Sequence, residues 1–258
     1  MSASVLLSGI EHHFDGVLAL SNIELSIAPG ETAALIGPSG AGKSTLLALL
    51  DGRLRGWSGA AVVLEQALNP AEAPHRDSRA DVGFIFQDFA LIERMTVHQN
   101  VMSGRLGRTG RIASLLGRFT DRDRALVQSV LDDTGLAELA ERRVDKLSGG
   151  QRQRVAIARC LAQEPKLILA DEPVSNLDPE RAKNVLELIA EQARKRNVGV
   201  IFTSHQPDLA KRFASRIIGL KDGCILFDKS SSALRQGDID TLYGGEVKSP
   251  SNELRLVV

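Results

Sequence analysis

The sequence predicts an α/β protein with a parallel β-sheet core, an antiparallel β subdomain near the N-terminus and a helical subdomain inserted into the core. Apolar and polar residues alternate at 23–27, which is typical of a half-exposed strand, whereas the continuous apolar runs at 32–37 and 166–170 indicate strands buried on both faces. Between about 92 and 163 the apolar residues recur at helical spacing. Strand and helix signals then alternate to about residue 227, as in a parallel sheet covered by helices.

The elements can be placed in order along the chain. Each expected strand is a short apolar or alternating run of residues. The strands that we expect lie at residues 4–10, 23–27, 32–37, 60–65, 82–86, 166–170, 198–202, 216–220 and 223–227. Residues 179–197, PERAKNVLELIAEQARKRN, have the charge content and apolar spacing of a long helix. We expect one domain over residues 4–244, with a helical insert at about 92–163, and a short tail at 245–258.

The composition is that of a globular chain and excludes several classes of protein. The 258 residues include 32 basic and 32 acidic side chains, and the aromatic residues are eight Phe, one Trp and one Tyr. A nucleic-acid binder usually carries a basic field and stacking aromatic residues, so we expect no nucleic-acid partner. No apolar run reaches the roughly 20 residues that span a bilayer, and the N-terminus has no basic leader. Cys160 and Cys224 lie in apolar stretches without metal-binding spacing, so we expect two buried free thiols.

Residues 37–45, GPSGAGKST, form a glycine-rich phosphate loop. They match G-x-x-x-x-G-K-[ST] between the apolar run TAALI and the helical run LLALL, which is the context that this motif requires. Its glycines let backbone N–H groups converge on phosphate oxygens at the positive end of the following helix. Lys43 is placed to reach the β- and γ-phosphates, and the Ser44 hydroxyl is placed to bind Mg²⁺. The motif predicts a P-loop NTPase (RecA-like) core, with these nucleotide-binding residues: Gly37, Pro38, Ser39, Gly40, Ala41, Gly42, Lys43, Ser44 and Thr45.

Two acidic residues follow the apolar run LILA, at the expected end of a buried parallel strand. Ligands of open α/β sheets bind at the carboxyl ends of the strands. Asp171 is placed to hold Mg²⁺ through its water shell, and Glu172 is placed to polarise an attacking water molecule as a general base. The alternative is an acidic pair that caps a helix before Pro173. The phosphate loop in the same chain favours the catalytic interpretation.

Residues 147–154, LSGGQRQR, make the set of motifs more specific than a phosphate loop alone. The serine and the two glycines would begin a helix, and the N–H groups at its positive end suit a γ-phosphate. The further motifs are Gln87 after a strand, SNLD at 175–178 and His205 after a strand. With these motifs in this order, the chain resembles the nucleotide-binding subunits of ABC (ATP-binding cassette) transporters over about residues 4–244.

The resemblance implies a head-to-tail dimer with two ATP molecules between the copies. One copy cannot easily present both its phosphate loop and its LSGGQ motif to the same nucleotide, so a second copy of the chain should be needed. The residues that would complete the partner's nucleotide site are Ser148, Gly149, Gly150 and Gln151. The resemblance further implies that Phe14 stacks on adenine where most members have Tyr, and that Asp178 helps to form the dimer contact.

The resemblance also implies how ATP is hydrolysed. Gln87 would reach Mg²⁺ and the attacking water, while its loop senses the transporter partner, and His205 would contact the γ-phosphate. The expected catalytic residues are Glu172, His205, Gln87 and Lys43. The expected metal ligands are Ser44, Gln87 and Asp171.

Within the ABC family, VMSGRLGRTGRIASLLGRF and RIIGLKDGCILFD resemble the phosphonate-importer branch. That branch implies an ATP-hydrolysing subunit at the cytoplasmic face of the inner membrane, which binds integral-membrane permease subunits and works indirectly with a phosphonate-binding protein. The alternatives are uptake of another phosphorus oxyanion such as phosphite, or a non-transport ABC ATPase acting on nucleic acid or ribosomes. We expect the permease near Gln87 and residues 92–119. The basic residues of that stretch would form a solvated polar face, lie beside anionic lipid or contact the partner, and charge alone does not decide between these. They are Arg94, Arg105, Arg108, Arg111 and Arg118.

Overall fold

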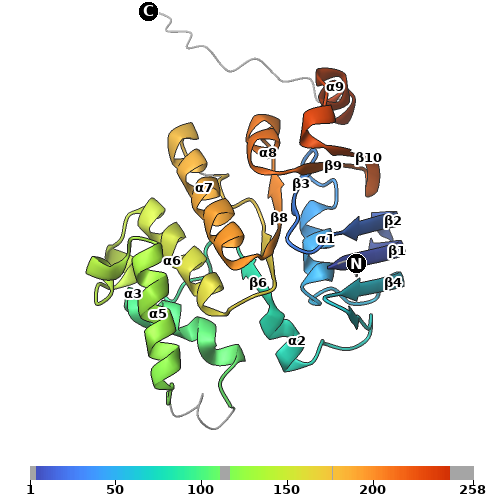
Figure 1. Cartoon of the computed structure of the whole chain (residues 1–258). Coiled ribbons are helices and arrows are strands. Elements are labelled where there is room, and N and C mark those ends of the chain that lie inside the picture. The colour runs from blue at the N-terminus through green and yellow to red at the C-terminus, as the bar shows by residue number, and fades with distance from the viewer. Residues whose placement is uncertain (1–3, 111–116, 176, 245–258) are drawn as a thin grey trace, which may run out of the picture.

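The computed structural model describes residues 4–110, 117–175 and 177–244, which form two β-sheets and the helices that cover them (Figure 1). The smaller sheet is antiparallel and has the order β2-β1-β4-β5. Its strands are β1 (Val5–Phe14), β2 (Val17–Ile27), β4 (Ser58–Val63) and β5 (Gln66–Ala67).

The larger sheet has the order β10-β9-β3-β8-β7-β6 and is parallel except for β10, which pairs antiparallel with β9. Its strands are β3 (Thr32–Ile36), β6 (Val82–Ile85), β7 (Leu167–Ala170), β8 (Gly199–Ser204), β9 (Arg216–Lys221) and β10 (Cys224–Ser230). The predicted α/β fold class, with a parallel core sheet and an N-terminal antiparallel sheet, is confirmed.

The helices divide between the two sides of the larger sheet. They are α1 (Lys43–Leu50), α2 (Arg76–Asp81), α3 (Val97–Ser103), α5 (Asp121–Asp133), α6 (Gly149–Ala162), α7 (Pro179–Arg196), α8 (Pro207–Phe213) and α9 (Gln236–Tyr243). Short 3-10 turns lie at Gly104–Gly107, Ala137–Leu139, Val144–Lys146 and Ser231–Ala233. Figure 1 shows α3, α5 and α6 grouped away from α1, which lies beside the antiparallel strands.

Two hydrophobic clusters hold these layers together. One contains α1 residues such as Leu46, together with Ile10 of β1 and Leu35 of β3. The other joins Ile157 of α6 and Ile189 of α7 to the opposite face of the sheet. Because the central strands are apolar on both faces, both clusters form against the same sheet, and this sandwich fixes the ends of β3, β7 and β8.

The first hairpin is longer than the sequence predicted. Instead of ending near residue 10 and resuming at 23, β1 continues to Phe14 and β2 begins at Val17. The hairpin turns at Asp15 and Gly16, which both have positive φ, as a two-residue turn matched to the twist of the strands requires. The predicted strand ended too early because the residues around His12 are polar, although His12 itself is buried.

The stretch predicted as helical at about 92–163 contains, among its described residues, helices and 3-10 turns and no strand of the sheets. Three of its helices begin with a side-chain cap. Thr96, Thr120 and Ser148 each form a reciprocal capping box at the N-terminus of α3, α5 and α6, respectively. Helix α6 packs against α3 and α5 and also against β6. The boundaries proposed for the domain, its insert and the tail at 245–258 stay predictions, and the tail lies outside the described residues.

The expectation of two buried thiols was half wrong. Cys160 is buried on α6, and burial raises the pKa of its thiol to about 12. Cys224 is exposed. The apolar run around it predicted burial, but β10 is the outermost strand of the larger sheet and its residues alternate between exposed and half-buried positions.

The expectation that the arginines between residues 94 and 118 lie on a solvated, lipid-facing or partner-facing surface was wrong for Arg105, whereas Arg108 is exposed. Arg105 is 5% exposed, and its Nε lies 2.7 Å from Oδ1 of Asp123. The Nη2 of Arg108 lies 2.7 Å from Oδ1 of Asp81 and donates to two backbone carbonyls. These two side chains therefore stabilise the insert. Arg94 and Arg118 are exposed, and Arg111 lies outside the described residues.

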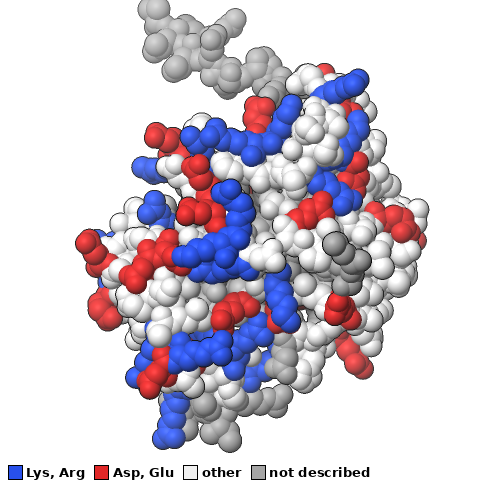
Figure 2. Space-filling model, viewed as in Figure 1, with Lys and Arg blue, Asp and Glu red and all other residues white. Residues whose placement is uncertain are grey.

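Basic and acidic side chains lie among each other on the face of the molecule shown in Figure 2, in line with the net charge of zero. Within residues 4–110, 117–175 and 177–244, no helix has both the length and the apolar character that a bilayer crossing requires.

Candidate nucleotide-binding site

The phosphate loop runs from the end of β3 to the start of α1 and depends on glycine at two close approaches. Gly37 has φ 154°, and a Cβ there would lie 2.0 Å from the backbone oxygen of Leu220. Gly42 has φ 98°, and a Cβ there would lie 2.6 Å from the backbone oxygen of Ala19. A side chain at either position would displace backbone, so the glycines of the motif are explained by contacts with β9 and β2.

Lys43 is the first residue of α1 and is 6% exposed. Its Nζ donates hydrogen bonds of 2.8 Å to the carbonyl oxygens of Gly37 and Pro38. The loop therefore curls around the ammonium group at the N-terminal end of α1. Backbone N–H groups, a helix N-terminus and a lysine at one point form an anion site suited to a chain of phosphates.

Replacing Gly42 by alanine should destabilise the fold, because the new Cβ meets backbone and the backbone conformation is strained for alanine. We expect the free energy of unfolding to fall by about 1–3 kcal/mol, as measured by urea denaturation. Gly40→Ala is the matched control, since Gly40 also has positive φ but a Cβ there would meet nothing within 4 Å. Equal losses in the two variants would contradict the role of the Ala19 contact.

A network of hydroxyl groups and one carboxylate lies at the ends of β7 and β8. The hydroxyl of Ser44 donates to Oδ1 of Asp171 at 3.1 Å, and the hydroxyl of Thr203 donates to the same oxygen at 2.9 Å. Thr203 Oγ1 also accepts a 2.7 Å hydrogen bond from the backbone N–H of Glu172. Sequence reasoning missed Thr203, which is fully buried on β8. Its one signal in the sequence is its place two residues before His205 at a strand end.

The side chains of the two acidic residues after β7 contact different partners. Asp171 faces Ser44, whereas Oε1 of Glu172 contacts Nε2 of His205, at the end of β8. Glu172 has φ 45°, an uncommon backbone conformation for a side chain of this size, and such strain gathers at functional sites. The side chains of His205 and Glu172 are 35% and 18% exposed, so a water molecule can reach the pair. The alternative of a helix-capping pair does not describe these contacts.

Gln87 follows β6 and lies beside the same groups. Its Nε2 donates to Ser175 Oγ at 3.5 Å, and Ser175 donates to the backbone oxygen of Glu172 at 3.3 Å. Ser44, Gln87 and Asp171 line one cavity of about 480 Å³. Their hydroxyl, amide and carboxylate oxygens are the donors that Mg²⁺ prefers, and few protein ligands suffice when phosphates and water fill the other positions, so the donor set fits this ion.

The LSGGQ segment lies elsewhere on the chain. Ser148 caps α6, accepting from the N–H of Gln151 at 3.3 Å, while Oε1 of Gln151 accepts from the N–H of Ser148 at 3.0 Å. A Cβ added at Gly149 or Gly150 would meet nothing within 4 Å, so this helix start is open. Figure 1 shows α6 and α1 apart in the molecule. The structure therefore brings Lys43 and this segment to different places.

The remaining predicted residues lie at exposed positions. Asp178 caps α7, and its Oδ1 accepts from the N–H of Arg181 at 3.0 Å. Phe14, at the end of β1, is 52% exposed and packs edge-on against the ring of His12, with ring centroids 4.4 Å apart. Because Phe14 and Ala19 belong to the same hairpin, and Ala19 touches Gly42, the exposed ring projects from the strands that border the phosphate loop.

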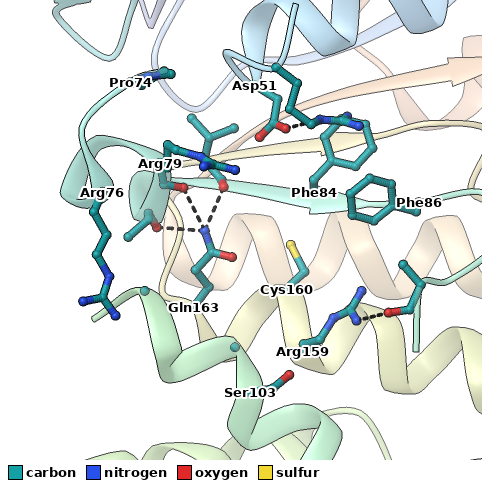
Figure 3. Close-up of a pocket in the computed structure, with 16 residues that line it drawn as sticks. Asp51, Pro74, Arg76, Arg79, Phe84, Phe86, Ser103, Arg159, Cys160 and Gln163 are labelled. Carbon is teal, nitrogen blue, oxygen red and sulfur yellow. Dashed lines mark hydrogen bonds and ion pairs between the residues drawn. The ribbon is translucent and has the colours of Figure 1, made fainter. Parts of the chain in front are cut away.

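A further cavity of about 590 Å³ lies between the core and the helical insert (Figure 3). Phe84 and Phe86 of the β6 segment form one wall, with the guanidinium of Arg53 over both rings. Arg159 of α6 and Gln163, the residue after α6, form another wall, and Ser103, Gly104 and Gly107 contribute a third. The sequence pointed to a surface near Gln87 and residues 92–119, but the contributions of Asp51 and Arg53 after α1, and those of α2 and β6, were not predicted.

Comparisons with known proteins agree with this geometry. The ABC transporter family model matches residues 20–175. A phosphonates import ATP-binding protein of Stutzerimonas stutzeri is 43% identical over 253 residues, covering 96% of this chain and 92% of that protein. The structure of cbiO1 from Clostridium perfringens, part of the ABC transporter complex cbiONQ, superposes with a TM-score of 0.81 at 25% identity over 96% of both chains. A dimeric ATP-binding cassette in a post-hydrolysis state with ADP and Pi gives a TM-score of 0.73 at 30% identity, covering 88% of this chain and 98% of that one.

The chain belongs to the ABC transporter family, and its fold is that of the ATP-binding cassette of that family. The resemblance predicted from LSGGQRQR and the other motifs is thereby confirmed. Among the curated proteins that it matches, those with the phosphonates import name are similar over nearly the whole chain.

Proposed function

We propose that the chain is the ATP-hydrolysing subunit of an importer, that two copies bind two ATP molecules with Mg²⁺, and that the imported cargo is phosphonate. The observation that carries the hydrolytic part is one cluster at the carboxyl ends of β3, β7 and β8. There the phosphate loop, the hydrogen-bonded Ser44 and Asp171, and the contacting Glu172 and His205 lie together.

The chemistry follows from these positions. Lys43 and the N–H groups of the loop hold the phosphates, and Ser44, Asp171 and Gln87 would hold Mg²⁺, which when bound neutralises phosphate charge. Glu172 accepts a proton from water as the water oxygen forms a bond to the γ-phosphorus. The bond to the bridging oxygen breaks, and its electron pair leaves with ADP. His205, through its contact with Glu172, orients the carboxylate.

Two copies are needed because the open start of α6 lies apart from the phosphate loop of the same chain. A helix N-terminus with exposed N–H groups suits the γ-phosphate of a nucleotide bound to another copy. The dimeric cassette with ADP and Pi, which is similar over 88% of this chain, supports this arrangement. The dimer would close on ATP and open after hydrolysis.

Mixing two inactive variants tests the dimer. Lys43→Ala removes the phosphate ligand from one copy, and Ser148→Arg blocks the start of α6 in the other. Each variant alone should hydrolyse no ATP, whereas an equal mixture should recover about a quarter of the wild-type rate, since half of the dimers are mixed and each has one complete site. The readout is phosphate release. A mixture as inactive as its components would contradict nucleotide sites shared between copies.

The cavity in Figure 3 supports a permease contact next to Gln87. It is open, it lies between core and insert, and it combines aromatic rings with arginine side chains. A cytoplasmic segment of a permease that enters it would contact the loop after Gln87, through Ala90. With such a contact, the subunit would lie peripherally at the cytoplasmic face of the membrane. Co-purification of a polytopic membrane protein supports this part, and co-purification of nucleic acid or ribosomes instead would contradict it.

The cargo is proposed from the relatives, because an ATPase subunit does not contact the cargo. Deleting the gene should abolish growth on a phosphonate as sole phosphorus source while growth on phosphate is retained. Wild-type chain should restore growth and Lys43→Ala should not. If only growth on phosphite depends on the gene, the cargo is that oxyanion and the phosphonate assignment is wrong.

A further inference from the structure

The loop after Gln87 has an unusual backbone. Phe89 and Ala90 are consecutive and have φ 65° and 46°, in the left-handed region that non-glycine residues rarely occupy. Two such residues in succession persist only when surrounding contacts hold them. The loop must therefore be stabilised from outside, and the stabilising contacts identify what controls its position.

Arg159 supplies those contacts. Its Nη2 donates to the carbonyl oxygen of Phe89 at 2.9 Å, and its Nη1 donates to the carbonyl oxygen of Ala90. Figure 3 shows the side chain of Arg159 reaching from α6 toward the loop, where a dashed line ends on a carbonyl oxygen. The planar guanidinium thus bonds both strained residues at once, and charge-assisted bonds of this kind are roughly twice as strong as neutral ones.

The environment of Arg159 indicates that this contact is its main role. Burial lowers the pKa of the guanidinium, with nearby Asp88 acting in the opposite direction. Within the described part of the chain, no ion pair includes Arg159. The guanidinium of Arg159 is thus a partly buried cation held by two carbonyls of one loop.

The loop in turn holds Gln87. The N–H of Phe89 bonds to the carbonyl of Phe86 at 3.1 Å, so residues 86–89 form a turn that contains Gln87. Among the residues that the structure describes, the side-chain amide of Gln87 makes only the 3.5 Å bond to Ser175. The position of this side chain beside Ser44 and Asp171 therefore depends on the turn, and the turn depends on Arg159.

We propose that Arg159 is a positioning residue for Gln87 and that it couples the helix that begins at Ser148 to the hydrolytic site of the same chain. Arg159 lies about three turns after Ser148 on α6, and α6 packs with α3 and α5. Movement of these helices is transmitted to Gln87 through the two carbonyls. The inference rests on the proposed function, since it assigns Gln87 to ATP hydrolysis.

The test is Arg159→Lys, which keeps a positive charge but replaces the two-pronged donor by a point charge. We expect kcat for ATP hydrolysis to fall about 10-fold, because a displacement near 1 Å can cost up to about 100-fold. The dissociation constant of ATP should stay within about 2-fold, since the phosphate ligands are untouched. In a Gln87→Ala background, Arg159→Lys should lower kcat no further.

Arg55→Lys is the matched control, because Nη1 of Arg55 also donates to two backbone carbonyls, but these belong to Gly52 and Leu54 and not to the loop after Gln87. It should leave kcat unchanged. Wild-type kcat in Arg159→Lys, the same loss in Arg55→Lys, or an additive loss with Gln87→Ala would each overturn the inference.

Hydrogen exchange separates this inference from the proposed function. Amides of residues 86–92 should exchange faster in Arg159→Lys than in wild type or Arg55→Lys, whether or not the chain hydrolyses ATP. Unchanged exchange there would overturn the inference alone. If the wild-type chain hydrolyses no ATP, but Arg159→Lys still exchanges faster than wild type at residues 86–92, the proposed function and the catalytic role of Gln87 are overturned.

Discussion

Glu172→Gln is expected to lower kcat for ATP hydrolysis by about 10²- to 10⁴-fold, the usual contribution of a general base. Glutamine keeps the size and most of the polarity of the side chain but cannot accept the proton of the attacking water. ATP binding should be retained, because Lys43 and the backbone N–H groups of the phosphate loop at the start of α1 are unchanged. Without hydrolysis the dimer should stay closed on ATP and be detected by size-exclusion chromatography.

Glu187→Gln is the control, since Glu187 is an exposed residue on α7. It should hydrolyse ATP at the wild-type rate and show no trapped dimer. Near-normal turnover in Glu172→Gln would remove Glu172 from the mechanism. His205→Ala separates the two members of the pair: if His205 acts by orienting the carboxylate, its removal should matter less in the Glu172→Gln background than in wild type.

Arg105→Met is expected to lower the free energy of unfolding by about 3–5 kcal/mol, which is the typical cost of removing one partner of a buried ion pair. The side chains of Arg105 and Asp123 are 6% and 10% exposed, and Arg105 also donates to the carbonyl of Ala162 and to Glu164 at 2.8 Å. Methionine fills the space but leaves the Asp123 carboxylate without its cation. Urea denaturation measures the loss.

The control for this prediction is Arg143→Met, which breaks the pair of Arg143 with Asp145. The side chains of that pair are 51% and 28% exposed, so the cost should be at most about 1 kcal/mol. Similar costs for the two variants would show that the buried pair has no special weight in the stability of the insert.

The same pair has a consequence for pH. Burial by itself would raise the pKa of Asp123, but the hydrogen bonds from Thr120 and Arg105 and the charge of Arg105 together lower it. A carboxyl whose pKa is lower in the folded state stabilises the fold above its unfolded pKa, and this stability is lost as pH falls through the folded pKa. Wild type should therefore lose stability below about pH 4 more steeply than Arg105→Met does.

The fold class was predictable because its signals are local. The apolar run before Gly37 and the run before Asp171 are strands in the structure, and both are followed by the polar motifs that the sequence placed at strand ends. The helix caps at Ser148 and Asp178 also depend on residues within one turn. Where the pattern was interrupted by polar residues, as at His12, the predicted element ended too early.

The contacts between motifs could not be predicted in the same way. Thr203 bonds to Asp171, and Arg159 bonds to Phe89, over separations of 32 and 70 residues. Neither residue belongs to a pattern with a stated chemistry, and each gains its role only from what lies opposite. Arg105 shows the reverse error, because the run of basic residues suggested a surface position and Arg105 is instead buried against Asp123.

By itself, the sequence determined that this chain has a phosphate loop after a buried strand, an acidic pair after another strand and a helix that begins with a serine and two glycines, since spacing along the backbone sets these features. Only the tertiary structure decided that Glu172 meets His205, that Thr203 serves both acidic residues, and that Arg159 holds the loop after Gln87. Those contacts depend on which strands are neighbours in the sheet and on how α6 packs. Both are set by the burial of apolar surface from the whole chain, which no local pattern contains.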